Sequence, residues 1–227
     1  MMKAELNAKH VVFFLIAVMT AYVLYHNERF LIEPENPIWE HYAKIKWLLL
    51  PHGLFGAVVI LLAPLQFSER LRKRYVKLHR IAGRLYVIGA LLASPLGAYL
   101  QYYEERLDQP RTFTILALIN AVMLMGATAL AFLFAYQRKI AQHRQWMVRS
   151  YAIALVFIVN RFILGVTGWE LLGVEMAQAI IWACLAMAVL LGDVAIYWKE
   201  IGNLFTTPAR AKAPVKQNVP DSVIEVI

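Results

Sequence analysis

Apolar stretches of about 20 residues recur along the whole chain, and an α-helix of this length crosses the hydrocarbon core of a bilayer. Hydrophobic residues make up 60% of the chain and its mean hydropathy is +0.54, which lies outside the range of soluble domains. We therefore predict an all-α fold, a polytopic transmembrane bundle of six helices that contacts the lipid bilayer. The predicted spans are 10–27, 47–67, 78–102, 112–137, 146–168 and 176–198.

The six spans form one predicted transmembrane domain over residues 1–200, and a cytoplasmic tail follows over residues 201–227. The tail is rich in Pro, Ala and Lys and has no hydrophobic periodicity, so we predict that it is disordered. The first span follows basic residues, as the core of a signal peptide does, but no small-residue cleavage site comes after it. It is therefore predicted to remain as a membrane anchor.

The net charge of +8 is divided among the loops that flank the predicted spans. Short cytoplasmic loops of membrane proteins are rich in Lys and Arg. When the N-terminus is placed in the cytoplasm, 17 of the 23 Lys and Arg residues fall on that side. Both termini are therefore predicted to be cytoplasmic, in a bacterial inner membrane. The basic residues are not interleaved with aromatic ones as in single-strand-binding surfaces, so nucleic acid is not an expected partner.

Two similar motifs begin predicted spans with a histidine and two arginines. The first, HRIAGRLY, covers residues 79–86, and the second, HRQWMVRSY, covers residues 143–151. Either these residues anchor the helices at the membrane surface, where arginine side chains extend toward lipid phosphates, or they hold a ligand. The candidate residues are His79, Arg80, Arg84, His143, Arg144 and Arg149.

A second polar layer is predicted near the other membrane surface. At about 1.5 Å per helical residue, His52 in the second span and Arg161 in the fifth lie at similar depths. An arginine within a span usually lines a cavity or meets a partner. His52 and Arg161 are therefore candidates for binding a quinol headgroup or another small polar ligand, and a packing role for His52 is the alternative.

Together with PHGLFG at residues 51–56, the two motifs make the chain resemble a family of bacterial integral membrane proteins known as a domain of unknown function (DUF2306-like). The resemblance covers about residues 45–165 and implies a membrane location and a helical fold. More distantly, the chain is similar to six-helix b-type cytochromes of the ascorbate ferrireductase kind. In those proteins, four histidines on helices two to five bind two haems.

The cytochrome resemblance implies one haem b, with His79 and His143 as iron ligands near the cytoplasmic face. The predicted fourth span has no histidine to partner His52, so a second haem is not implied. The resulting prediction is electron transfer between the cytoplasmic side and a quinol or another redox partner. The haem propionates would be neutralised by bidentate contacts from the arginines of the two motifs, Arg80, Arg84, Arg144 and Arg149.

The alternative is a non-enzymatic membrane subunit or small-molecule carrier, in which the same His, Arg and Asp residues form structural pairs between helices. An unpaired charge at the centre of a membrane costs at least about 2.5 kcal/mol. Asp193, near the end of the sixth span, is therefore predicted to pair with Arg84 or Arg149 at a similar depth.

Overall fold

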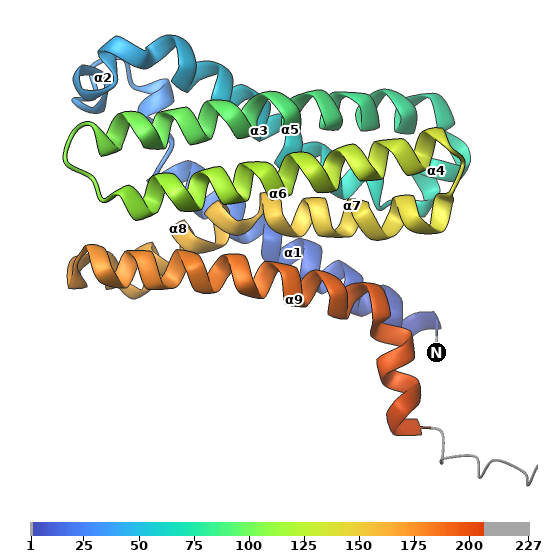
Figure 1. Cartoon of the computed structure of the whole chain (residues 1–227). Coiled ribbons are helices and arrows are strands. Elements are labelled where there is room, and N and C mark those ends of the chain that lie inside the picture. The colour runs from blue at the N-terminus through green and yellow to red at the C-terminus, as the bar shows by residue number, and fades with distance from the viewer. Residues whose placement is uncertain (1, 207–227) are drawn as a thin grey trace, which may run out of the picture. The chain divides into compact units, whose positions relative to one another are not determined.

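The computed structural model describes residues 2–206, and every regular element in that part of the chain is helical (Figure 1). The prediction of an all-α, multi-pass membrane protein is therefore confirmed. Five helical segments are long and apolar enough to cross a membrane, namely Ala43–Gln66, Val76–Glu105, Arg111–Tyr136, Ile140–Thr167 and Val174–Asn203.

The long helices alternate with short helical turns. The long ones are α1 (Met2–His26), α3 (Lys46–Gln66), α5 (Val76–Glu105), α6 (Arg111–Tyr136), α7 (Ile140–Ala154), α8 (Val156–Thr167) and α9 (Val174–Thr206). The connecting turns are η1 (Arg29–Ile32), α2 (Ile38–His41), η2 (Ala43–Ile45), α4 (Glu69–Arg74) and η3 (Trp169–Leu172).

Two of the predicted spans differ in the structure. The apolar part of α1 is His10–His26, which is shorter than the five segments with spanning length. The predicted fifth span is interrupted at Leu155, which separates α7 from α8. It also begins at Ile140 instead of residue 146, so the second motif lies wholly within a helix.

Helix α9 continues to Thr206, past residue 201 where the tail is predicted to begin. The rest of the predicted tail, 207–227, lies outside the described residues.

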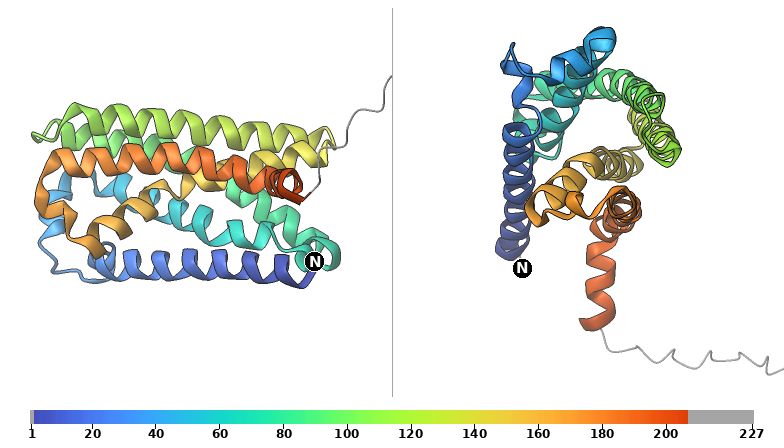
Figure 2. Two further views of the ribbon diagram at one scale, coloured as in Figure 1. Left: turned by 90° about the horizontal axis from the view of Figure 1, so that it is seen from below. Right: turned by 90° about the vertical axis from the view of Figure 1, so that its left-hand side faces the viewer.

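Helices α3, α5, α6 and α7 surround one hydrophobic core, and each packs on the next in that order (Figures 1 and 2). Successive helices of this bundle are antiparallel, so α5 and α7 run in the same direction (Figure 1). Ala63, Ala90 and Ala131 have no exposed surface. Small residues allow helices to approach closely in a membrane, where association depends on van der Waals packing and hydrogen bonds.

The closest helix approach in the bundle core involves Gly89 of α5 and helix α3. A Cβ atom at Gly89 would lie 3.1 Å from the carbonyl oxygen of Phe55 and 3.1 Å from Cγ2 of Val59. Both distances are shorter than an ordinary van der Waals contact. Glycine is therefore required at this position for α5 to lie against the backbone of α3.

Helices α8 and α9 pack beside the bundle, and α1 contacts α8. The edge of the Tyr22 ring meets the Phe162 ring with centroids 5.2 Å apart, and the Tyr22 hydroxyl lies over Gly165. A second apolar cluster joins α9 to α6 and α8, and its buried members are Leu116, Val156, Ile180, Ile181, Cys184 and Leu185.

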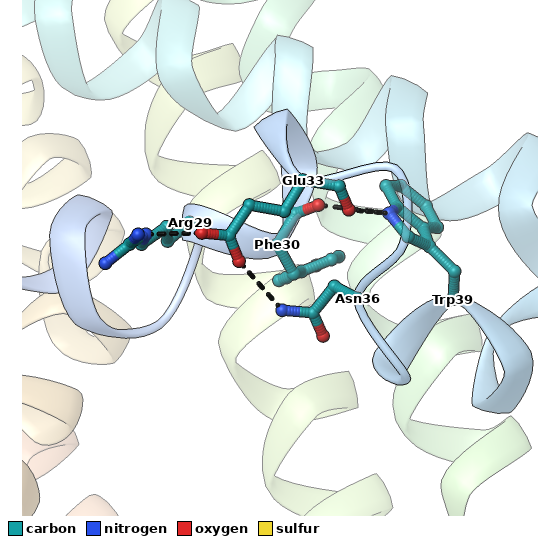
Figure 3. A network of polar contacts seen from close by, with 5 residues as sticks. All are labelled: Arg29, Phe30, Glu33, Asn36 and Trp39. Atoms are coloured by element: carbon teal, nitrogen blue, oxygen red, sulfur yellow. Dashed lines mark hydrogen bonds and ion pairs between the residues drawn. The ribbon is translucent and has the colours of Figure 1, made fainter.

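A compact polar network fixes the connection between α1 and α3 (Figure 3). The indole nitrogen of Trp39 donates to the carbonyl oxygens of Phe30 and Glu33, at 3.0 and 3.1 Å. The Glu33 carboxylate accepts from the Asn36 amide at 3.1 Å and pairs with Arg29 at 2.5 Å. These two partners, Asn36 first, lower the pKa of Glu33. The connection is therefore ordered although it lies outside the spanning segments.

Replacing Gly89 by valine should lower the stability of the bundle, because the new side chain would meet a carbonyl oxygen that cannot move away. Overpacking of this kind typically costs about 1–3 kcal/mol. Gly56→Val is the matched control, since nothing lies within 4 Å of a Cβ atom at Gly56. Thermal unfolding in detergent measures the difference, and equal midpoints for the two variants would contradict the described packing.

Candidate functional site

The two predicted histidines lie at the same end of the bundle, which we call the histidine end. His79 is the fourth residue of α5, and His143 is the fourth residue of α7. Both side chains are half-buried, and they are close enough for their charges to interact. The structure therefore brings together the histidines of the two motifs.

A buried hydrogen bond shows how α5 and α7 face each other. The Tyr86 hydroxyl lies 2.7 Å from Ser150 Oγ, and the two residues are 64 positions apart. His79 and His143 are separated by the same 64 positions. His79 lies about two helical turns before Tyr86 on α5, and His143 lies about two turns before Ser150 on α7. Since α5 and α7 are parallel, residues two turns earlier on the same helix faces also point toward each other. Tyr86 thus spans the gap between α5 and α7 two turns beyond the histidines.

Thr128 of α6 completes this hydroxyl cluster. Its Oγ1 atom lies 2.8 Å from Ser150 Oγ, and Tyr86, Thr128 and Ser150 are all fully buried. Sequence analysis missed these three residues, because single hydroxyl groups within apolar spans are common. The repeated 64-residue spacing between the two motifs was the signal that could have indicated Tyr86 and Ser150.

The partners of the histidines determine which ring nitrogens are available. His143 Nδ1 lies 2.8 Å from the carbonyl oxygen of Ala131 and donates a hydrogen bond to it. The Nε2 atom of neutral His143 therefore keeps its lone pair. This arrangement, with one ring nitrogen donating to a carbonyl, is typical of histidines that bind a metal through the other nitrogen.

Gln66, the last residue of α3, is the partner of His79. In the amide orientation that satisfies both ends, its nitrogen donates to His79 Nδ1 at 3.1 Å and its oxygen accepts from Gly83 N at 3.2 Å. In this orientation Nδ1 accepts, so the proton of neutral His79 lies on Nε2.

The predicted ionic pair on Asp193 is confirmed, and Arg149 is its partner. Arg149 Nε donates to Asp193 Oδ1 at 2.8 Å, and Arg149 Nη2 lies 2.8 Å from the same oxygen. Gly192, next to Asp193, lies against α7: a Cβ atom there would be 3.5 Å from Cβ of Ala152 and 3.8 Å from Cα of Arg149. The pair joins α9 to α7.

The other arginines of the two motifs have different surroundings. Arg80 interacts electrostatically with His79, and so does Arg72 of α4, which sequence analysis did not select. Arg84 and Arg144 are exposed. Arg80 is exposed as well, so three arginines of the motifs are exposed and Arg149 is paired with Asp193.

A cavity of about 340 Å³ lies between α6, α7 and α9. Its walls are almost entirely apolar, and Arg149 is the one charged residue among them. Trp146 also lines the cavity, and the Arg149 guanidinium lies over its ring, 5.0 Å from the centroid. The lining residues are Val122, Met123, Gly126, Ala127, Leu130, Trp146, Arg149, Ile153 and Val189.

His52 of the predicted outer layer packs against α5. Its Nδ1 atom lies 2.9 Å from the carbonyl oxygen of Ala93 and donates to it. A Cβ atom at Gly97 would lie 2.7 Å from His52 Cε1, so the glycine makes room for the ring. These contacts fix α3 on α5 near the imidazole.

Arg161, the other predicted outer residue, has a partner in a different part of the molecule. Its guanidinium bonds to the carboxylate of Glu28, which follows α1, and its side chain is 46% exposed. His52 and Arg161 thus have separate partners, and neither lines the cavity between α6, α7 and α9. The sequence predicts that the Arg161 charge lies within the membrane. In the structure, the carboxylate of Glu28 after α1 pairs with this charge.

The fold and its intramembrane polar contacts define a multi-pass, all-α membrane protein. Residues 49–196 match the family described as predicted membrane protein (DUF2306). This match covers more than half of the 227 residues, so the chain belongs to that family, as the three motifs predicted. No curated protein matches the chain, and no solved structure matches it.

Replacing Asp193 by leucine should destabilise the protein, because it leaves the Arg149 guanidinium without its carboxylate. The control is Glu69→Leu, which breaks the exposed pair with Lys73, where the side chains are 74% and 67% exposed for Lys73 and Glu69. We expect Asp193→Leu to cost about 1–3 kcal/mol more, less than a fully buried pair because Asp193 is 45% exposed.

The double variant Arg149→Leu, Asp193→Leu tests the pairing itself. It should recover part of the lost stability, since two apolar groups replace a pair without leaving a single charge. Thermal unfolding in detergent compares the unmodified protein, Asp193→Leu, Arg149→Leu and the double variant. Additive losses from the two single substitutions would show that the side chains do not interact.

Proposed function

We propose that this chain is a six-span protein of the bacterial inner membrane that binds one b-type haem between α5 and α7. His79 and His143 are the proposed iron ligands, and the function is electron transfer between the cytoplasmic side and a quinol or another donor. The observation that carries the proposal is that Tyr86 and Ser150, which bond across α5 and α7, are 64 residues apart, as are His79 and His143. It supports two imidazoles that face each other from parallel helices.

The surroundings of the histidines fit this role. His143 is held by the Ala131 carbonyl with Nε2 free. Gln66 donates to Nδ1 of His79, so its amide would have to turn for iron to bind His79 through Nε2. The Tyr151 hydroxyl, on the turn after Met147 in α7, is buried and has no hydrogen-bond partner within residues 2–206. A buried donor without a partner is uncommon and favours a further group at this end of the bundle.

Several cations near the histidine end suit the carboxylates of a haem. Arg72 and Arg80 interact electrostatically with His79. Arg84 on α5 and Arg144 on α7 are exposed. Arg149 is occupied by Asp193, so we do not assign it to a propionate. When bound, a bis-histidine haem supplies a one-electron carrier. The Phe67 ring lies 5.8 Å from that of Tyr151 and adds an apolar group beside this residue.

Six spans with both termini in the cytoplasm complete the proposal. The apolar segment of α1, His10–His26, would extend about 26 Å as a helix, close to the roughly 30 Å of a hydrocarbon core. The basic residues gather in the loops that this topology assigns to the cytoplasm, among them those of α4. Both features support an even number of spans.

An absorption spectrum of the purified protein, after expression with ample haem, tests the proposal. We expect a Soret band and the sharp α band of a six-coordinate, low-spin haem in the reduced protein. His79→Ala and His143→Ala should each abolish the low-spin spectrum by removing an axial ligand. His41→Ala is the control, because that histidine pairs with Glu104 outside the histidine end and should leave the spectrum unchanged.

The competing function is a membrane subunit or small-molecule carrier without haem. Purified protein without a Soret band would contradict the haem proposal. Unchanged thermal stability and membrane insertion of the double variant His79→Ala, His143→Ala would then show that the histidines are not structural pairs either.

A further inference from the structure

We propose that the cavity between α6, α7 and α9 binds the ring of an isoprenoid quinone or quinol from the bilayer, with Arg149 as the hydrogen-bond donor to a ring oxygen. The site is separate from the histidine end and from His52 and Arg161. That the ligand acts as an electron donor rests on the proposed function, whereas its binding does not require haem.

The size and walls of the cavity fit the ring of such a ligand. Its volume of about 340 Å³ is within the usual range of sites for small molecules, about 300–1,000 Å³. Gly126 leaves open space, since nothing lies within 4 Å of a Cβ atom there. Val122 and Val189 at the rim are 65% and 39% exposed on spanning helices, so they face lipid. An isoprenoid tail can therefore leave the cavity toward the bilayer.

The Arg149–Asp193 pair has unused hydrogen-bonding capacity. Both bonds from Arg149, through Nε and Nη2, go to Oδ1 of Asp193. Within the described residues, Arg149 Nη1 has no acceptor and Asp193 Oδ2 has no donor. Arg149, which lines the cavity, thus offers one donor for an oxygen of the ring, and Asp193 holds its guanidinium in place.

The charge of the pair selects a neutral ligand. Arg149 and Asp193 cancel each other, so a fatty acid carboxylate would add an uncompensated negative charge close to Asp193. A quinone adds no charge. Trp146 also favours a planar group, because aromatic rings stack in offset or edge-to-face arrangements at the wall of the cavity. These features together favour a quinone over an acyl chain.

Binding of ubiquinone-2 to the full chain in nanodiscs tests this proposal. Saturable quenching of tryptophan fluorescence gives the dissociation constant. Gly126→Leu should weaken binding by at least about tenfold, because leucine fills the cavity while its helix propensity is higher than that of glycine. The matched control is Gly53→Leu, which also adds a side chain at a helical glycine with open space but lies on α3, away from the cavity.

Two further measurements separate the alternatives. Val189→Trp narrows the cavity from α9 and should also weaken binding, so the test does not depend on one variant. Excess oleate should not displace ubiquinone-2. Equal dissociation constants for Gly126→Leu and Gly53→Leu, or displacement by oleate, would overturn the proposal. Loss of the Soret band in the haem experiment would leave these binding results unaffected, so the two proposals fail independently.

Discussion

Hydrocarbon offers no hydrogen-bond partner, so a polar side chain in a spanning helix is stable when another helix satisfies it. In this protein such contacts join the helices in pairs. His52 bonds to Ala93 between α3 and α5, and His143 bonds to Ala131 between α6 and α7. The Tyr86–Ser150 bond sets the register of α5 against α7. Each bond has one geometry, whereas apolar packing alone allows many.

Small residues make these polar contacts possible. The bundle helices meet through Gly89 and three alanines without exposed surface, so their backbones lie close enough for short side chains to bond across them. Helix α9 approaches α7 closely at Gly192, next to the ionic pair, while the cavity opens beside that contact. The cavity between α6, α7 and α9 therefore has apolar walls and one charged residue, Arg149. Tight contact at one point and open space next to it are common where a membrane protein holds a ligand.

The candidate sites differ in how far the sequence could predict them. The two similar motifs indicated His79 and His143. In the structure each is the fourth residue of its helix, and the two helices are parallel. Gln66 and Arg72 could not be selected, because they lie on other helices and enter the site only through packing. A ligand site shared by His52 and Arg161 was predicted from their similar depth. Depth along a helix contains no information on which way the side chain points, and the two residues have separate partners.

Hydrophobic length and basic loops determined the helical, membrane-spanning class of this protein from the sequence by itself, because a segment in hydrocarbon must satisfy its backbone internally. The boundaries of α3, α5 and α6 also followed within three residues, whereas α1 and α7 begin earlier than predicted, α9 extends further and Leu155 interrupts the fifth span. Only the tertiary structure decided that Asp193 bonds to Arg149 and not to Arg84, and that a cavity lies beside them. Those outcomes depend on the rotation of each helix about its axis, which is set by contacts between residues far apart in the chain.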